Sequence, residues 1–227
     1  MVGRHCLQLR LILGFGILAA VGAGCGTGAQ DTSATHPNQL PHSDLVSSAD
    51  ASQSVAASTA AALRELVQQF ALPTQTRGVT LIFVLPDCPI ANSYAAEYSR
   101  LSSDFASRGI PLIVVYVDPD LTSAQMAEHA NQYLLKCPVL LDSQLTWANR
   151  AGATKTPEAA VFDLHGGLLY RGRIDDRYAA VGKSRAIATT HDLRTALEAI
   201  LAGKPVAQRF TDAVGCHIPA QAHEGTN

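Results

Sequence analysis

Cysteine is the residue type in this chain best suited to covalent chemistry, and Cys88 stands in the most reactive setting. It follows the run Val79–Leu85, which is rich in β-branched and aromatic residues, and it directly precedes Pro89. Because proline is favoured at the first position of a helix, we expect a helix to begin beside Cys88. A thiolate there faces unpaired backbone N–H groups and the positive end of the helix dipole, which can lower a cysteine pKa from about 8.5 into the range of roughly 3.5–7.5. This setting favours a nucleophilic thiol over a buried, inert one.

The other cysteines differ in their expected roles. Cys6 and Cys25 lie near the N-terminus, which leaves Cys88, Cys137 and Cys216 in the part of the chain expected to fold. Cys137 stands beside a predicted strand, and we expect a packed core thiol there because free cysteine is among the most buried residue types. An odd number of cysteines in an oxidising compartment leaves at least one free thiol or an intermolecular partner.

The N-terminus has the pattern of an export signal. Basic residues precede an apolar run over residues 11–21, and small residues and Cys25 follow. A basic flank, an apolar core of roughly 7–15 residues and a small-residue exit are typical of a secretory signal, whereas a membrane span needs about 20 apolar residues. We predict a signal peptide over residues 1–25 and a periplasmic or membrane-anchored location. Cys25 is similar in position to the cysteine of a lipoprotein cleavage box, but Gly22 departs from the usual leucine, so lipid attachment and simple release both stay open.

Composition divides the rest of the chain into three parts. Residues 26–55 are mostly small and polar, and such a segment cannot bury enough apolar surface to offset its ordering entropy, so we predict a flexible linker. A folded domain is expected over residues 56–205 and a C-terminal tail over residues 206–227. The net charge is −2, and nothing marks nucleic acid or an anionic membrane surface as a partner.

Hydrophobic periodicity predicts an α/β domain. Residues 79–85 and 110–117 are continuous apolar runs, typical of strands covered on both faces. Because strands first alternate with helices and then pair as a hairpin, the order favours a mixed central β-sheet flanked by helices. The remaining expected elements are helices over 61–70, 89–109, 122–135, 145–151 and 191–201, with a capping box at the start of the third, and strands over 139–142, 159–163 and 168–171.

Four segments in this order resemble the redoxin branch of the thioredoxin-like superfamily, which includes the alkyl hydroperoxide reductase/thiol-specific antioxidant proteins. They are residues 83–94, 138–142, 152–158 and 170–176. The resemblance covers roughly residues 63–202 and implies a thioredoxin-like fold. It also implies that Thr156-Pro157 is a cis-proline turn facing Cys88, with Asp175-Asp176-Arg177 nearby; cis is otherwise uncommon, at about 5–6% of X–Pro bonds.

The sequence departs from the family pattern at two places. Ala91 stands where a dithiol oxidoreductase of this fold carries the second cysteine of Cys-x-x-Cys, so local dithiol exchange through that motif is excluded. Leu81 and Leu85 stand where peroxiredoxins carry a proline and a threonine or serine before the reactive cysteine. The usual peroxide-activating pocket is therefore not supported.

Cys216 is the best candidate partner for Cys88. It lies in the tail beyond the last predicted helix, and a Gly-Cys near the C-terminus recurs in proteins that resemble this one. If the tail folds back over the active edge, Cys216 could resolve an adduct on Cys88, or it could form a static disulfide that fastens the tail. Geometry decides between pairing and no pairing, since a disulfide needs Cα atoms within about 7 Å.

A metal site has weaker support. Cys88, Cys216 and His217 could form a soft ligand set suited to copper, and related thioredoxin folds include exported copper carriers. Those carriers have two cysteines close together in sequence, which this chain lacks. His129 and His165 are expected to be solvated. We predict no metal and no cofactor, and we keep copper delivery as an alternative function.

The export signal and the resemblance together predict an exported redoxin-type thiol protein that acts on a protein or small-molecule thiol, disulfide or peroxide. As a hypothesis, the Cys88 thiolate attacks the substrate, Cys216 resolves the adduct, and Pro157 shapes the substrate face; the resolving step needs a second thiol because exchange passes through a mixed disulfide. A non-catalytic thioredoxin-fold module is the second alternative.

Overall fold

The computed structural model of the chain describes residues 48–219. The expected signal peptide, the candidate lipid-bearing Cys25 and most of the expected linker lie outside the described residues. Within residues 48–219, no helix is both long enough and apolar enough to cross a bilayer.

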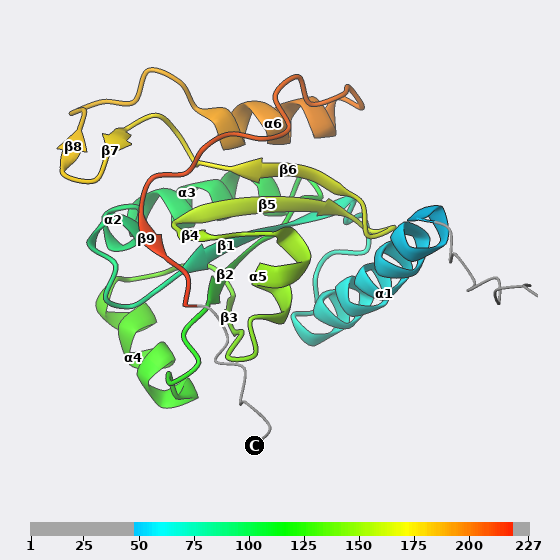
Figure 1. Cartoon of the computed structure of the whole chain (residues 1–227), viewed down its shortest axis with the longest axis horizontal. Coiled ribbons are helices and arrows are strands. Elements are labelled where there is room, and N and C mark those ends of the chain that lie inside the picture. The colour runs from blue at the N-terminus through cyan, green and yellow to red at the C-terminus, as the bar shows by residue number, and fades with distance from the viewer. Residues whose placement is uncertain (1–47, 220–227) are drawn as a thin grey trace, which may run out of the picture. The chain divides into compact units, whose positions relative to one another are not determined.

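A mixed five-stranded sheet forms the centre of the domain, with strand order β3-β2-β1-β5-β6 (Figure 1). β2 runs parallel to both β1 and β3, whereas β5 runs antiparallel to both β1 and β6. This arrangement confirms the expected mixed α/β sheet. The strands are β1 (Gly78–Val84), β2 (Leu112–Tyr116), β3 (Val139–Leu141), β5 (Glu158–Asp163) and β6 (Leu168–Gly172).

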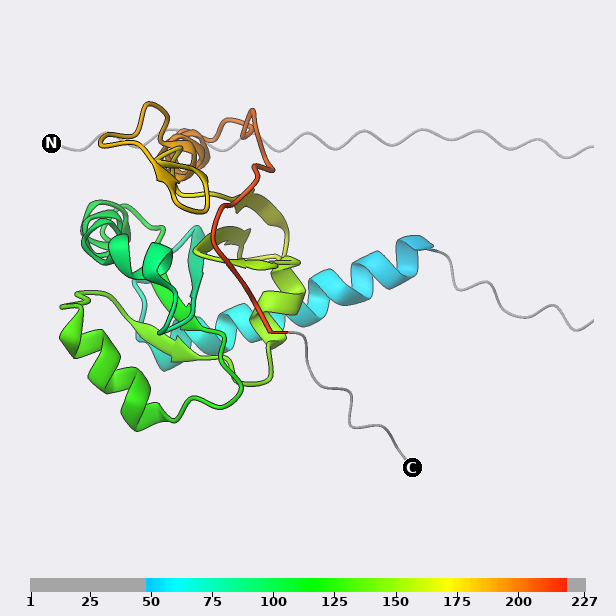
Figure 2. The ribbon, with the colours of Figure 1, turned by 60° about the vertical axis from the view of Figure 1, so that its left-hand side comes forward.

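Helices pack on both faces of this sheet, as Figures 1 and 2 show. They are α1 (Ser48–Gln69), α2 (Pro89–Ser93), α3 (Ala95–Ala106), α4 (Ser123–Gln132), α5 (Thr146–Ala151) and α6 (Asp192–Leu201). Ion pairs of Arg194 with Asp104 at 2.7 Å and of Arg108 with Glu198 at 2.6 Å join α3 to α6. The capping box predicted at the start of α4 is present.

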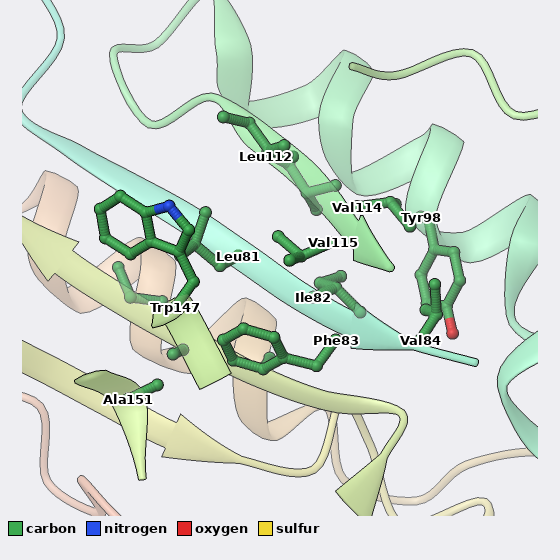
Figure 3. Close-up of a cluster of buried hydrophobic side chains, with 14 of the residues drawn as sticks. Leu81, Ile82, Phe83, Val84, Tyr98, Leu112, Val114, Val115, Trp147 and Ala151 are labelled. Carbon is green, nitrogen blue, oxygen red and sulfur yellow. The ribbon is translucent and has the colours of Figure 1, made fainter. Parts of the chain in front are cut away.

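β1 lies at the centre of the hydrophobic core. All seven of its residues are buried, and their side chains alternate between the two faces of the sheet. Figure 3 shows the surrounding cluster, in which side chains of β2, α3 and α5 pack against β1. A strand held on both faces has a fixed end, so the residues that directly follow β1 start from a defined position.

Two helices differ from the sequence-based prediction. α1 begins at Ser48, so residues 48–55 of the predicted linker are helical. The added length extends an amphipathic helix whose buried residues, Ala60, Leu63 and Leu66, lie on one face against the core.

The helix predicted over residues 89–109 is two helices separated at Tyr94. The Ser93 hydroxyl donates to the Ile90 carbonyl at 2.7 Å, and such a local bond competes with the backbone ladder at the end of α2. The helix that follows the reactive cysteine is therefore only five residues long.

Two short two-stranded sheets complete the fold, and neither was predicted from the sequence. β7 (Tyr178–Ala180) pairs with β8 (Lys183–Ser184), and β4 (Lys155–Thr156) pairs with β9 (Cys216–His217), a strand of the tail. The tail first runs beside β6, where the Arg171 N–H donates to the Arg209 carbonyl at 2.8 Å.

Gly172 permits this close passage of the tail. It has φ +149°, and a Cβ placed there would lie 2.0 Å from the Thr211 hydroxyl oxygen. The tail then crosses to β4, as the red segment in Figure 1 shows.

We expect Asp142→Ala to destabilise the domain by about 1–2 kcal/mol, the usual cost of losing a helix cap. The buried Asp142 carboxylate accepts the backbone N–H groups of Thr146 and Trp147 at 2.8 Å and of Ala148 at 3.1 Å, at the start of α5. Urea unfolding measures the change. Asp120→Ala, on an exposed turn, serves as the control and should change stability by less than about 0.5 kcal/mol. Equal effects of the two substitutions would contradict the role of Asp142.

Candidate active site

Cys88 directly follows the loop after β1 and is the N-cap of α2. Its Sγ accepts the Ala91 N–H at 3.5 Å, and its thiol donates to the Thr156 carbonyl at 3.1 Å. The side chain is 0% exposed. The sequence therefore placed this thiol correctly at a helix start, but the structure adds a complete cover over it.

The Thr156-Pro157 peptide bond is cis and faces Cys88, as the family resemblance implied. Glu158 holds the backbone before this turn. Its buried carboxylate accepts the N–H groups of Thr154 at 2.9 Å and Lys155 at 3.2 Å, and it lies 3.5 Å from the Arg171 guanidinium. The backbone of β4 is therefore constrained on the side of the turn away from Cys88.

The tail folds back over this edge. β9 pairs with β4 in antiparallel orientation, with Cys216 opposite Thr156 and His217 opposite Lys155. The Ile218 N–H extends the pairing by donating to the Thr154 carbonyl at 3.0 Å. The structure thus brings Cys216 to the active edge, which the sequence left open.

Cys88 and Cys216 lie on facing segments, since Cys216 pairs with Thr156, whose carbonyl accepts from Cys88, and their pKa values move in opposite directions. Burial raises the pKa of Cys88, but hydrogen bonds from the Cys216 thiol, from Thr156 and from backbone N–H groups outweigh it and lower that pKa below its ordinary value. Burial and the hydrogen bond to Cys88 raise the pKa of Cys216 to about 12. Within residues 48–219, both cysteines are free thiols. Cys88 is therefore the more acidic thiol of the two.

Thr156 contributes a second donor from its side chain. Its hydroxyl is fully buried and has no hydrogen-bond partner in the described part of the chain. An unpaired buried hydroxyl costs about 1–3 kcal/mol. The Cys88 sulfur is an acceptor that this hydroxyl could use once the thiol is ionised, and the Thr156 side chain accordingly lowers the pKa of Cys88.

The sequence predicted that the three charged residues of the loop after β6, Asp175-Asp176-Arg177, lie near Cys88. The structure confirms this only in part. Tyr94 donates to Asp175, and these two side chains, together with Pro157 and Val214, line a hollow of about 10 Å³. A volume of this size is near the minimum for one water molecule. This hollow therefore has no room for more than a water molecule.

The other two charged residues of this loop point elsewhere. Hydrogen bonds from the Thr189 hydroxyl and from backbone N–H groups hold the pKa of Asp176 well below its usual range. The Arg177 guanidinium stacks on the ring of Tyr94, 3.8 Å from its centroid. Asp176 and Arg177 are therefore parts of the loop structure, and Asp175 is the member of the three that reaches the active edge.

The remaining candidate residues, two histidines and one cysteine, differ in how deeply they are buried. His129 was expected to be solvated, but it is half-buried: its ring nitrogens lie 2.9 Å from the Tyr116 hydroxyl and 3.2 Å from the Pro86 carbonyl, because α4 packs over the loop that leads to Cys88. His165 is exposed, as expected. Cys137 packs against the core, and burial raises its pKa to about 12, which agrees with an inert core thiol.

The candidate copper set is not assembled. Cys216 and His217 are neighbours on a strand, so their side chains point to opposite faces and His217 cannot join the two sulfurs. In the part of the chain that the structure describes, no group of three or more histidine, cysteine or acidic side chains is placed to hold a metal ion.

The sequence profile described as the AhpC/TSA family matches residues 53–171, more than half of the chain. The chain belongs to this family. The matched segment contains Cys88 and Pro157 but ends before the tail, so Cys216 lies outside it. No curated protein sequence matches the chain significantly.

Solved structures show the same fold. An uncharacterized conserved protein from Geobacillus kaustophilus is 25% identical, with a TM-score of 0.56 over 64% of this chain and 78% of that protein. A hypothetical protein from Sinorhizobium meliloti 1021 is also 25% identical, with a TM-score of 0.56 over 65% of this chain and 82% of that one. A secreted Mycobacterium tuberculosis disulfide oxidoreductase homologous to E. coli DsbE is more distant, at 16% identity and a TM-score of 0.39 over 54% of this chain and 81% of that one.

Sequence reasoning missed two residues that shape the site. Glu158 is an acidic residue at the start of an otherwise apolar strand, and a carboxylate in that setting signals a buried partner. Thr156 was noted only as the residue before Pro157. Its orientation toward Cys88 had no signal in the sequence.

We expect Thr156→Val to raise the pKa of Cys88, since the variant keeps the shape of the side chain but loses its hydroxyl donor. Thr156→Ser keeps a donor and should behave like the parent. Thiolate absorbance as a function of pH, corrected with the matching Cys88→Ser variant, measures the change. The titration should begin at lower pH in the parent and at higher pH in Thr156→Val, which would then hold less thiolate at neutral pH. An unchanged titration in Thr156→Val would show that the hydroxyl does not act on Cys88.

Proposed function

We propose that this protein is a thiol–disulfide oxidoreductase in which Cys88 attacks and Cys216 resolves. One observation carries the proposal: two free thiols meet at the cis-proline turn, where Cys216 pairs opposite Thr156 and the Cys88 thiol donates to the Thr156 carbonyl, and their pKa values are displaced in opposite directions. Thiol–disulfide exchange needs a thiolate for attack and a second thiol for release of the mixed disulfide. The pair has both properties.

In the first step, the Cys88 thiolate attacks one sulfur of a substrate disulfide. A bond forms between Cys88 and that sulfur, the substrate S–S bond breaks, and the second substrate sulfur leaves as a thiolate that takes up a proton. The hydrogen bonds from the Thr156 hydroxyl and from backbone N–H groups stabilise the attacking thiolate before this step.

In the second step, Cys216 loses its proton and attacks the Cys88 sulfur. A Cys88–Cys216 disulfide forms, and the first substrate sulfur leaves as a thiolate. The substrate disulfide has then gained two electrons, and the two protein thiols have lost them. An external dithiol that returns two electrons completes the cycle, and the same steps in reverse oxidise a substrate dithiol.

The high pKa of Cys216 suits the resolving role. While Cys88 is a thiolate, the Cys216 proton is shared with it, so Cys216 remains protonated and unreactive. Once Cys88 is bonded to substrate, its negative charge is gone, and the interaction that raised the pKa of Cys216 is lost. Resolution therefore becomes easier only after attack has occurred.

Export belongs to this proposal. The predicted signal peptide would deliver the chain to an oxidising compartment, where disulfides form and persist. Anchoring through Cys25 remains an alternative to release, and both concern residues outside the described range.

We expect Cys216→Ser to accumulate a covalent adduct on Cys88 when the protein is mixed with a disulfide substrate, because the resolving thiol is missing. Cys88→Ser should form no adduct, and Cys137→Ser, which removes the core thiol, should turn over like the parent. Mass spectrometry of the intact protein under non-reducing conditions detects the adduct. If Cys88→Ser reacts as fast as the parent, the assignment of the nucleophile is wrong.

The reduction potential of the Cys88–Cys216 pair separates exchange from a structural role. Structural disulfides have potentials below about −300 mV. We expect a higher value, measured by equilibration with glutathione and quantified by thiol labelling of each cysteine. A value below that limit would favour a non-catalytic module whose disulfide only fastens the tail.

A further inference from the structure

The tail lies beside the reactive thiol, and we infer that it covers that thiol. Cys88 is 0% exposed although it stands at the end of a strand and the start of a helix, where loops are normally accessible. Cys216 lies directly opposite Thr156, whose carbonyl accepts from Cys88. A substrate sulfur can reach Cys88 only after this part of the tail has moved away.

The tail is attached in two separate places. Near residue 210 it pairs with β6, where Thr211 donates to the Arg171 carbonyl at 3.1 Å. Further on, β9 pairs with β4 at Cys216 and His217, and the Ile218 N–H adds one more bond to the Thr154 carbonyl. The second attachment is short and separate from the first, so β9 can separate from β4 while the first attachment stays in place.

If β9 leaves, the edge of β4 becomes exposed. This edge accepts only a segment whose backbone can approach Thr156 as closely as Gly215 does. A Cβ placed on Gly215 would lie 1.8 Å from the Thr156 carbonyl oxygen and 2.6 Å from its carbon. Both are backbone atoms, and Glu158 holds the segment before Thr156, so neither can move away easily. Only glycine fits at this position, directly before the cysteine that contacts Cys88.

We propose that β9 occupies the place of a substrate segment, and that the substrate is an extended polypeptide with glycine directly before its reactive cysteine. Such a segment would add to β4 as a strand in the register of the tail, with its cysteine opposite Thr156. This inference rests on the proposed exchange activity. Tail and substrate then exclude each other, and the return of Cys216 to resolve the mixed disulfide also displaces the substrate from β4.

Activated peptides test the substrate preference. The protein is the full chain with Cys216→Ser, and the peptide has the sequence of residues 213–218, with its cysteine in a disulfide with nitrothiobenzoate. The Cys88 thiolate forms a disulfide with the peptide sulfur, the bond to the aryl sulfur breaks, and the coloured aryl thiolate leaves with the electron pair. We expect the glycine peptide to react about tenfold faster than the same peptide with alanine in place of glycine, the rate ratio expected from a modest overpacking clash.

Substitution in the tail itself tests the cover. Gly215→Ala in the full chain should separate β9 from β4 and speed alkylation of Cys88 by iodoacetamide about tenfold. Asp212→Ala, on an exposed residue of the same tail, is the matched control and should leave the rate unchanged. Peptide mapping by mass spectrometry assigns the label to Cys88. An unchanged rate in Gly215→Ala would overturn the covering role of the tail.

Reaction with a small aryl disulfide distinguishes failure of the exchange activity from failure of the selection for glycine. If Cys88 in Gly215→Ala fails to react even with this reagent, the exchange activity itself is wrong. If Cys88 reacts with the reagent but the Cys216→Ser protein takes up the glycine and alanine peptides at equal rates, exchange stands and the selection for glycine is overturned. A faster reaction of the glycine peptide supports both.

Discussion

The pairing of β9 with β4 is the interaction on which the rest of the site depends. Two residues on each strand set Cys216 opposite Thr156, and a glycine at position 215 allows the two backbones to approach closely enough. This one contact covers Cys88 and places the second thiol beside it. It also supplies the first of the hydrogen bonds that lower the pKa of Cys88 against the cost of burial.

The reactivity of Cys88 therefore has a different origin from that of an exposed cysteine at a long helix. α2 is only five residues long, and a single backbone N–H from it reaches the sulfur. The remaining donors come from the tail and from the cis-proline turn, two segments far from Cys88 in sequence. Because each donor also belongs to the cover over Cys88, the acidity of the thiol and its accessibility are linked.

The site joins a family scaffold to a segment outside the family match. β1, buried on both faces, fixes the start of the loop that carries Cys88, and the cis-proline turn lies within the matched residues of the AhpC/TSA family. Cys216 lies beyond that match. In this chain the second thiol comes from the tail, which fits the absence of a second cysteine at Ala91.

Local patterns in the sequence were sufficient for the buried strands, the capping box at Thr122 and the helix start at Cys88, because each depends on residues close together along the chain. Resemblance to the redoxin proteins was needed for the cis bond before Pro157. Only the tertiary structure decided that Cys216 reaches Cys88, that His129 is half-buried and that His217 points away from the sulfurs. These outcomes depend on contacts between distant segments, whose register is set by packing and strand pairing and leaves no periodic pattern in the sequence.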